Sequence, residues 1–431
     1  MYDKGLPSLP DDILCEIFCL LDMEALKSCS LTGKALSCSA KSFIHRTLYL
    51  IPRPSGIRMP KYSGPWNEFE GLSTLSERDL LQHTRHISIF LPHRKTLFVR
   101  DLAPHIQHLR KITNLRSLKT CWLDVPSFIP KMEDYFGAFL GSLRSLELEH
   151  PRGDHKEVLY FACQFQNLRD LKVNGLEDYF HSMRVGGPQF EIKTSPPLDG
   201  TLDLQMNLNP GSKWRDLKGP QLLLSNLLTL PSGLKFRTIK LSRCTGDNLQ
   251  LLIDVCAPTL ECMALASDGF GKSFHQGDEC SLFTFVRTIS LSGAPHCPPL
   301  SFKRHPALRE LEISLTERAR LESAAGWLSE TLSTITSNAF TKLTISISLV
   351  SFLFRAVGDD YVRGWNSVDD VLDQLNRCED VTLVAKMTEW VKGDNFGGVI
   401  EEYFPLMWVK GRVVLEVPPP TTREVALKRI Y

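Results

Sequence analysis

The sequence predicts an α/β chain with a small all-α module at the N-terminus, followed by an irregular solenoid of βα repeats. Hydrophobic residues 9–31 recur with helical spacing, a pattern L-x-x-L-x-L recurs from residue 84 onward, and stretches of helical period lie between its copies. Stacked units of this kind place a parallel β-sheet on the concave face and helices or loops on the convex face. The predicted parts are residues 6–50 (helical module), 51–83 (linker), 84–417 (repeat array) and 418–431 (tail).

The first predicted helix, from Pro10 to Leu21, is apolar nearly all round. Only Asp11, Asp12 and Glu16 are polar. A surface helix normally buries a single stripe, and a unit of about 40 residues is small for an independent core. We therefore expect a partner protein to cover the second apolar face of this helix.

Two further helices complete the predicted module. Asp22 can end the first helix and cap the second, which runs through Cys29. A third helix is predicted from Ser39 to Leu48, with Phe43 and Ile44 facing inward.

The segment LPDDILCEIFCLLDMEALKSCSL, residues 9–31, resembles the F-box, a helical module of substrate receptors in SCF-type ubiquitin ligases. The resemblance implies that this segment binds the Skp-family linker protein and, through it, a cullin scaffold. The matching positions implied to bind the linker are Leu9, Pro10, Ile13, Leu14, Ile17, Phe18, Leu21, Leu26 and Leu31.

Residues 32–36 depart from that family's pattern, because Leu36 stands where a Trp is common. Two alternatives therefore remain open. The segment could be an ordinary helical hairpin that caps the next domain, or the chain could be a non-ligase repeat scaffold with a degenerate F-box. A test of linker binding separates the ligase adaptor from this scaffold.

The repeat array begins at residue 84. Ten steps of the pattern follow the first copy, and the nine steps from residue 84 to residue 340 average about 28 residues, within the range of leucine-rich repeats. The resemblance to leucine-rich-repeat F-box proteins of fungal type covers about 330 residues. The predicted copies start at Thr84, Leu115, Leu143, Leu168, Asp199, Phe236, Leu260, Val286, Leu308, Phe340 and Cys378.

Arginine recurs at the second position of the copies. This ladder could bind an acidic or phosphorylated ligand. We favour an architectural interpretation, with each stem packed and each charged head in solvent, because recurrence along the whole array suits architecture better than a local site. The arginines are Arg85, Arg116, Arg144, Arg169, Arg237, Arg287 and Arg309.

Strand alternation predicts a recognition face. If the last two pattern positions face the core, the residue between them faces outward on the concave sheet. These outward residues mix both signs of charge, which suits a specific protein surface better than a polyanion. The substrate-binding candidates are Lys119, Glu147, Lys172, Asp203, Lys240 and Glu312.

Composition and motifs exclude several classes of function. The net charge is +1, no run of residues has the length of a membrane span, and no export signal is expected, so we predict no nucleic-acid or membrane partner. Twelve scattered cysteines without an N-x-Ser/Thr site indicate reduced thiols in the cytoplasm or nucleus. Residues 52–71 and 186–220 are irregular, and residues 404–417 are expected to form a last strand.

No catalytic or metal-binding set is evident. Phosphate-binding and zinc-hydrolase motifs are absent, and the pairs His83/His86 and His105/His108 lack further ligands nearby. The pair His296–Cys297 lacks an orienting acid. We therefore predict a non-catalytic receptor without cofactor or metal, which holds a protein substrate where another subunit delivers ubiquitin.

Overall fold

The computed structural model divides into two compact units, residues 1–199 with 229–232 and residues 200–228 with 233–431. Both are α/β units with parallel strands, as the sequence predicts. The structure describes residues 11–32, 34–51, 66–68, 71–90, 97, 99–176, 190–205, 218–242, 248–267, 298–315, 321–348, 359–375, 380–386 and 396–416.

Unit 1 begins with three helices, the helical module: α1 (Asp11–Leu20), α2 (Met23–Thr32) and α3 (Lys34–Ile44). The Asp22 carboxylate accepts a hydrogen bond from the Ala25 amide at 2.8 Å, which confirms the predicted cap of α2. The three helices share a small core of buried residues: Leu14, Phe18, Leu26 and Ala40.

The third helix begins earlier than predicted, at Lys34 and not at Ser39, and ends earlier, at Ile44 and not at Leu48. Residues Thr47–Ile51 form strand β1, which pairs in parallel with β3 and buries Leu48 and Leu50. The alternation of these two leucines is a strand signal inside a segment that we interpreted as helix. The sheet therefore starts within the region assigned to the module.

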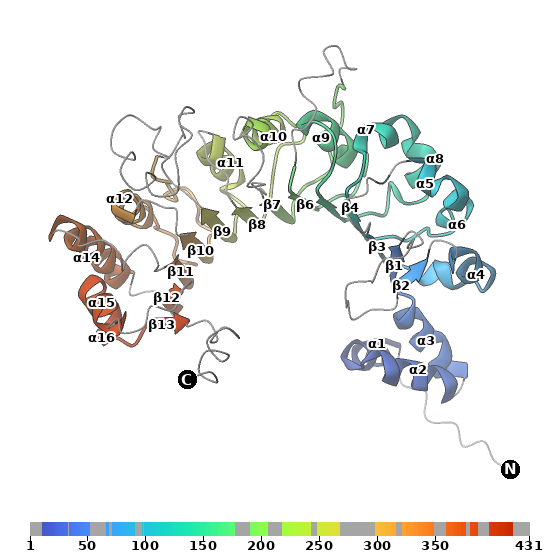
Figure 1. Cartoon of the computed structure of the whole chain (residues 1–431), viewed down its shortest axis with the longest axis horizontal. Helices are drawn as coiled ribbons and strands as arrows, with labels where there is room; N and C mark the ends of the chain where they lie inside the picture. The colour runs from blue at the N-terminus through green and yellow to red at the C-terminus, as the bar shows by residue number, and fades with distance from the viewer. Residues whose placement is uncertain are drawn as a thin grey trace, which may run out of the picture. The chain divides into compact units, whose positions relative to one another are not determined.

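The sheet of unit 1 has the strand order β2-β1-β3-β4-β5-β6. Leu118 of β4 lies opposite Leu146 of β5, which lies opposite Leu171 of β6, so the inward leucines form a continuous row. Helices cover one face of this sheet (Figure 1), and we call the other face the open face. The strands not yet placed are β2 (Trp66–Glu68), β3 (His86–Ile89), β4 (Ser117–Cys121), β5 (Ser145–Glu149) and β6 (Asp170–Asn174).

The helical layer of unit 1 packs aromatic rings against the sheet. The ring of Phe136 lies 5.6 Å from that of Phe161 and 5.7 Å from that of Phe128, and all three side chains are buried. The first two of the helices, together with β2, lie inside the predicted linker of residues 51–83. The helices are α4 (Gly71–Glu77), η1 (Leu80–His83), α5 (Val99–Leu102), η3 (Ala103–His105), α6 (Ile106–Leu109), α7 (Val125–Phe128), η4 (Ile129–Lys131), α8 (Met132–Phe136), η5 (Gly137–Phe139) and α9 (His155–Cys163).

Unit 2 continues the same arrangement, with the strand order β7-β8-β9-β10-β11-β12-β13 and helices along one face of the sheet (Figure 1). The strands are β7 (Thr201–Gln205), β8 (Thr238–Ser242), β9 (Cys262–Ser267), β10 (Glu310–Leu315), β11 (Lys342–Ser348), β12 (Asp380–Lys386) and β13 (Val413–Glu416). The helices are α10 (Lys218–Leu228), α11 (Asn248–Cys256), α12 (Leu321–Leu332), α14 (Asp359–Gln374), α15 (Phe396–Tyr403) and α16 (Pro405–Val409).

The last predicted strand, residues 404–417, is largely a helix in the structure. Pro405 begins α16, and the buried Asp369 carboxylate accepts hydrogen bonds from the amides of Leu406 and Met407 at 2.6 and 3.1 Å. This cap from a distant helix holds the segment helical, and only β13 is a strand.

Ten of the eleven predicted repeats contain a strand, and the copy starting at Val286 lies outside the described residues. The predicted alternation is confirmed: in β5, for example, Leu146 and Leu148 are buried while Glu147 between them is not. The outward residues therefore lie on the open face of each unit.

Candidate functional site

Helix α1 carries two apolar faces. Leu14 and Phe18 are buried in the module core, whereas Ile13 and Ile17 are 41% and 40% exposed and Leu20 is 87% exposed. The exposed residues follow one another at spacings of four and three positions, which places them on one stripe of the helix. We call Ile13, Ile17 and Leu20 the apolar stripe. Exposed apolar side chains grouped on one face can mark a protein-binding site.

The structure sorts the residues predicted to bind the linker. Ile13 and Ile17 lie on the stripe, and Leu31 at the end of α2 is 87% exposed. A second group packs inside the module: Leu14, Phe18 and Leu26 are buried, and the partly buried Leu21 packs against them. Leu9 and Pro10 lie outside the described residues.

Leu20 is a stripe residue that the sequence reasoning missed. Leu21, which the resemblance implied, continues the spacing of Leu14 and Phe18, and that spacing marks the core face. The signal for Leu20 was its position seven residues after Ile13, one residue out of phase with the core face.

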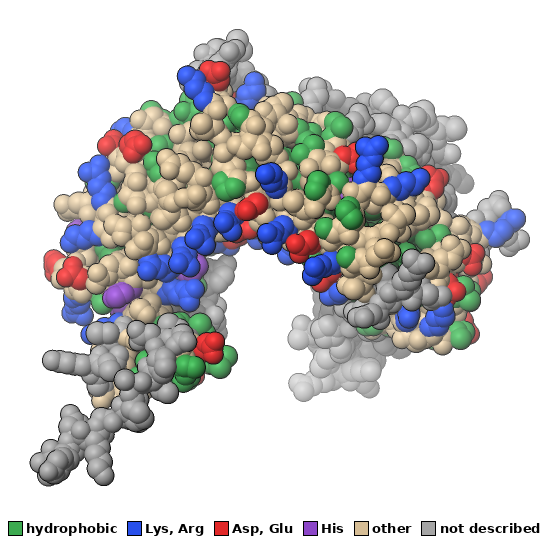
Figure 2. Space-filling view, turned by 180° about the vertical axis from the view of Figure 1, so that it is seen from behind, with side chains coloured by type: hydrophobic (Ala, Val, Ile, Leu, Met, Phe, Trp, Pro, Cys, Tyr) green, Lys and Arg blue, Asp and Glu red, His purple; other side chains and the backbone are tan. Residues whose placement is uncertain are grey.

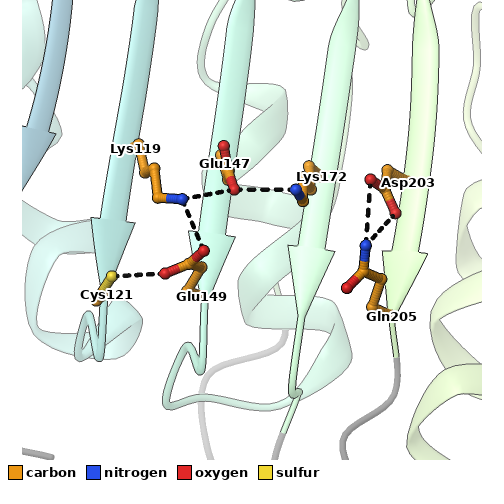
Figure 3. A network of polar contacts seen from close by, with 7 residues as sticks. All are labelled: Lys119, Cys121, Glu147, Glu149, Lys172, Asp203 and Gln205. Atoms are coloured by element: carbon orange, nitrogen blue, oxygen red, sulfur yellow. Dashed lines mark hydrogen bonds and ion pairs between the residues drawn. The ribbon is translucent and has the colours of Figure 1, made fainter. Parts of the chain in front are cut away.

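The second candidate surface is an ion-pair network on the open face of unit 1 (Figure 3). Lys119, Glu147 and Lys172 lie directly opposite one another on β4, β5 and β6. The Lys119 Nζ is 3.0 Å from Glu147 Oε1, and Lys172 Nζ is 3.1 Å from the same oxygen. Lys119 Nζ also lies 2.7 Å from Glu149 Oε1. Three predicted substrate-binding residues thus come together in one network.

Glu149 links this network to a buried thiol. The Cys121 Sγ donates a hydrogen bond to Glu149 Oε2 at 2.8 Å. Burial alone would raise the pKa of Glu149, but the hydrogen bonds from Cys121 and Lys119 outweigh it and hold the pKa below its ordinary value. Burial alone would lower the pKa of Lys119, but the hydrogen bonds to Glu149 and Glu147 outweigh it and raise the pKa above its ordinary value. Glu149 and Lys119 are therefore both ionised at neutral pH, and the network pairs two lysines with two glutamates.

A stacked pair of rings lies at the carboxyl ends of β4 and β5. The rings of Trp122 and His150 are 4.4 Å apart and nearly parallel. Both residues have positive φ, 58° and 50°, a conformation that costs non-glycine residues roughly 1–2 kcal/mol. Backbone bonds hold them there: the Trp122 amide donates to the Glu149 carbonyl at 2.7 Å, and the His150 amide donates to the Asn174 carbonyl at 2.6 Å.

Gly175 leaves the space that the His150 ring of this stack occupies. It follows β6 with φ 68°, and a Cβ at this position would lie only 2.4 Å from His150 Nδ1. A side chain here would displace the imidazole ring, so a glycine is required both by the backbone angle and by the space. The stack therefore presents a flat aromatic pair next to the ion-pair network.

The candidates in unit 2 are less tightly paired. Asp203 of β7 lies opposite Lys240 of β8, and the Asp203 carboxylate accepts a hydrogen bond from Gln205 Nε2 at 3.2 Å. The side chains of Lys240 and Glu312 are exposed, and β9 with Ala264 lies between their strands. These two charges are available to an incoming protein surface.

Three cysteines in the described part of the chain, Cys121, Cys163 and Cys256, are buried. No group of three or more His, Cys, Asp or Glu residues there is arranged to hold a metal ion. Burial raises the pKa of the Cys163 thiol to about 12 and that of Cys256 to about 11, which makes both poor nucleophiles. The pair His296–Cys297 lies outside the described residues.

None of the described helices has the length and hydrophobicity needed to cross a bilayer. No protein-family model matches the chain, and the comparison with curated proteins found no match.

We expect Glu149→Gln to weaken the ion-pair network by about 1–2 kcal/mol at pH 7, because a charged partner of Lys119 is lost. The depressed pKa of Glu149 makes its contribution complete above the ordinary value of 4.5 and removes it as the pH falls through the lower, folded value. The difference from the wild type should therefore shrink in acid. Hydrogen-exchange protection of the β4 and β5 amides measures this difference. Glu133→Gln, at an exposed residue, is the control. An equal loss of protection at pH 7 and in acid would contradict the stabilising role of the Glu149 charge.

A second expectation concerns Gly175, which packs against the His150 ring. Gly175→Ala should destabilise the strand ends by more than Gly233→Ala, although both glycines have nearly the same φ, 68° and 67°. The reason is that no atom lies within 4 Å of the Cβ built at Gly233, whereas Gly175 faces His150. The backbone cost is roughly 1–2 kcal/mol in both variants, and the excess in Gly175→Ala measures the collision. Equal losses in the free energy of unfolding, measured by chemical denaturation, would show that the His150 ring does not restrict the residue at position 175.

Proposed function

We propose that this chain is a substrate-recognition adaptor of an SCF-type ubiquitin ligase. The helical module binds the Skp-family linker, which in turn binds a cullin, and the open face of the repeat sheet binds a protein substrate. The repeats are proposed to be degenerate leucine-rich repeats. The observation that carries this proposal is the apolar stripe of α1, which stays exposed although the other face of the helix is packed in a core of its own.

The packing of the module supports a partner for the stripe. Because Leu14 and Phe18 already complete the core with help from α2 and α3, the stripe residues are not needed to hold the three helices together. Phe18 and Phe43 meet edge to face with ring centroids 5.7 Å apart, which strengthens this core. The F-box resemblance of residues 9–31 names the linker as the occupant of the stripe.

The character of the open face supports a protein substrate. Its outward residues carry both signs of charge, and those of unit 1 balance one another. A balanced network gives orientation and specificity more than long-range attraction. The adaptor would raise the effective concentration of the substrate at the ligase and perform no bond chemistry itself.

A second candidate function is a non-ligase scaffold with a degenerate F-box. The feature that favours it is the departure at residues 32–36, where Leu36 replaces the common Trp. Leu36 is only partly buried and packs against the module core. A scaffold of this kind would bind partners on the open face but would not bind the linker.

Ile17→Asp should abolish co-purification of the chain with the Skp-family linker, because it places a charge in the centre of the apolar stripe. The matched control is Leu251→Asp on α11, since Leu251 is also exposed, at 53%, but lies outside the module. Phe18→Asp is unsuitable, because Phe18 is buried and its replacement would unfold the module. If the Ile17 variant retained a helical circular dichroism spectrum and still bound the linker as the wild type does, the adaptor function would be refuted.

The substrate face can be tested separately. Reversing two exposed charges with Lys240→Glu and Glu312→Lys should remove proteins that proximity labelling finds around the wild type, while binding of the linker persists. The matched control reverses exposed charges on the helical side, Lys156→Glu on α9 and Glu330→Lys on α12. Identical sets of labelled proteins for the wild type and the open-face variant would contradict this assignment of the face.

A further inference from the structure

The residue directly before each strand, which we call the entry position, is an arginine in five neighbouring strands of unit 1. These are the strands β1, β3, β4, β5 and β6, which lie side by side in the sheet. Arg46 belongs to this row although it lies outside the predicted repeats. The entry arginines of unit 1 are Arg46, Arg85, Arg116, Arg144 and Arg169.

The backbone of the entry positions forms a regular ladder. The Arg46 carbonyl accepts hydrogen bonds from the amides of Arg85 and His86 at 2.8 and 3.0 Å. The carbonyls of Arg85, Arg116 and Arg144 accept the same pair of bonds from the next strand. Successive entry residues are therefore one strand spacing apart, about 4.8 Å.

This ladder does not require arginine side chains. In unit 2 the carbonyl of Gly200 accepts the same two bonds, at 2.9 and 3.2 Å, and the carbonyl of Glu261 does so at 2.7 and 3.1 Å. A glycine and a glutamate thus serve the backbone as well as an arginine does. Architecture alone, the interpretation we first favoured, does not explain five consecutive arginines in unit 1.

The charges of the unit 1 entry positions are poorly compensated. Arg116 and Arg144 are exposed, and no acidic side chain pairs with either among the described residues. Arg85 donates to a backbone carbonyl, that of Asn114, at 3.3 Å, which leaves its charge unbalanced. Among the described residues a carboxylate pairs with Arg169 at the end of the row, whose Nε is 3.5 Å from Asp199 Oδ1.

Burial and the excess of positive charge lower the pKa values of two neighbouring histidines, His86 and His83. Burial lowers the pKa of His86, and the guanidinium groups of Arg46, Arg116 and Arg85 lower it further. Burial also lowers the pKa of His83, with Arg85 and Lys41 adding to the shift. Figure 2 shows Lys and Arg side chains gathered over unit 1 with His beside them.

We propose that the five entry arginines of unit 1 bind an extended, carboxylate-rich segment of a partner protein. The row spans about 19 Å at one strand spacing per arginine, the length of about six residues of extended chain. Each guanidinium can hold a carboxylate through two parallel hydrogen bonds. Single-stranded nucleic acid fits less well, because the entry positions offer no aromatic side chain on which bases could stack.

This surface is separate from the two in the proposed function. It lies at the amino ends of the strands, whereas the ion-pair network lies on the open face and the stripe on α1. Binding there does not depend on the linker, so failure of one proposal leaves the other intact.

The test uses the purified full chain and a fluorescein-labelled peptide of about eight glutamates, long enough to span the row at ~3.3 Å per residue. Fluorescence anisotropy at low salt should show binding that weakens as salt screens the charges. Arg116→Ala with Arg144→Ala should weaken binding by about tenfold. The matched control, Arg237→Ala with Arg309→Ala, removes the same charge from exposed entry positions of unit 2 and should leave affinity within about twofold.

Three results would overturn the proposal. The first is that the wild type fails to bind the peptide. The second is that both double variants lose affinity equally, because the effect would then be one of net charge. The third is that an oligouridylate of the same charge binds more tightly than the peptide, which would make the row a nucleic-acid surface.

Discussion

Parallel pairing of one short strand per repeat is the constraint on which the rest of the structure depends. Each strand has only four to seven residues in most repeats, so few ladder bonds hold it. The entry carbonyl adds two further bonds to the next strand, as between Arg116 and the amides of Arg144 and Ser145. This register sets which side chains lie opposite one another. The row of inward leucines, the ion-pair network and the entry arginines all follow from it.

The same register separates the surfaces of unit 1 by their chemistry. Residues inside a strand alternate between the core and the open face, and there lysine and glutamate from neighbouring strands neutralise one another. The entry positions of β1, β3, β4, β5 and β6 all hold arginine. Like charges therefore accumulate at the entry edge, whereas opposite charges pair on the open face.

The helical module separates a buried apolar face of α1 from an exposed one. Its core contains Leu14, Phe18 and Leu26, whereas the stripe residues Ile13, Ile17 and Leu20 of α1 stay exposed. Burying several apolar side chains of this size on a partner can supply a substantial part of a binding free energy, at about 25 cal/mol per Å² of apolar surface. The exposed stripe is thus the physical basis for proposing a partner protein, whatever its identity.

Much of the fold follows from local patterns. The alternation in copies such as residues 143–148 placed the strands and the outward residues, and Asp22 was predicted as a cap from its position alone. Such features depend on neighbours along the chain, and the sequence displays those directly. The strand of residues 47–51 was misread, because a short apolar run is compatible with either a helix or a strand until a pairing partner is known.

The sequence by itself determined the α/β class, most of the strands and the sets of residues that face outward. Tertiary structure alone decided which of them meet. Glu149, Cys121 and the stack of Trp122 on His150 came together through strand register, and Arg46 joined the entry row only because β1 pairs with β3. Leu20, not Leu21, became the exposed residue because α2 and α3 cover one side of α1. Contacts between distant segments depend on packing and register, which no local period records.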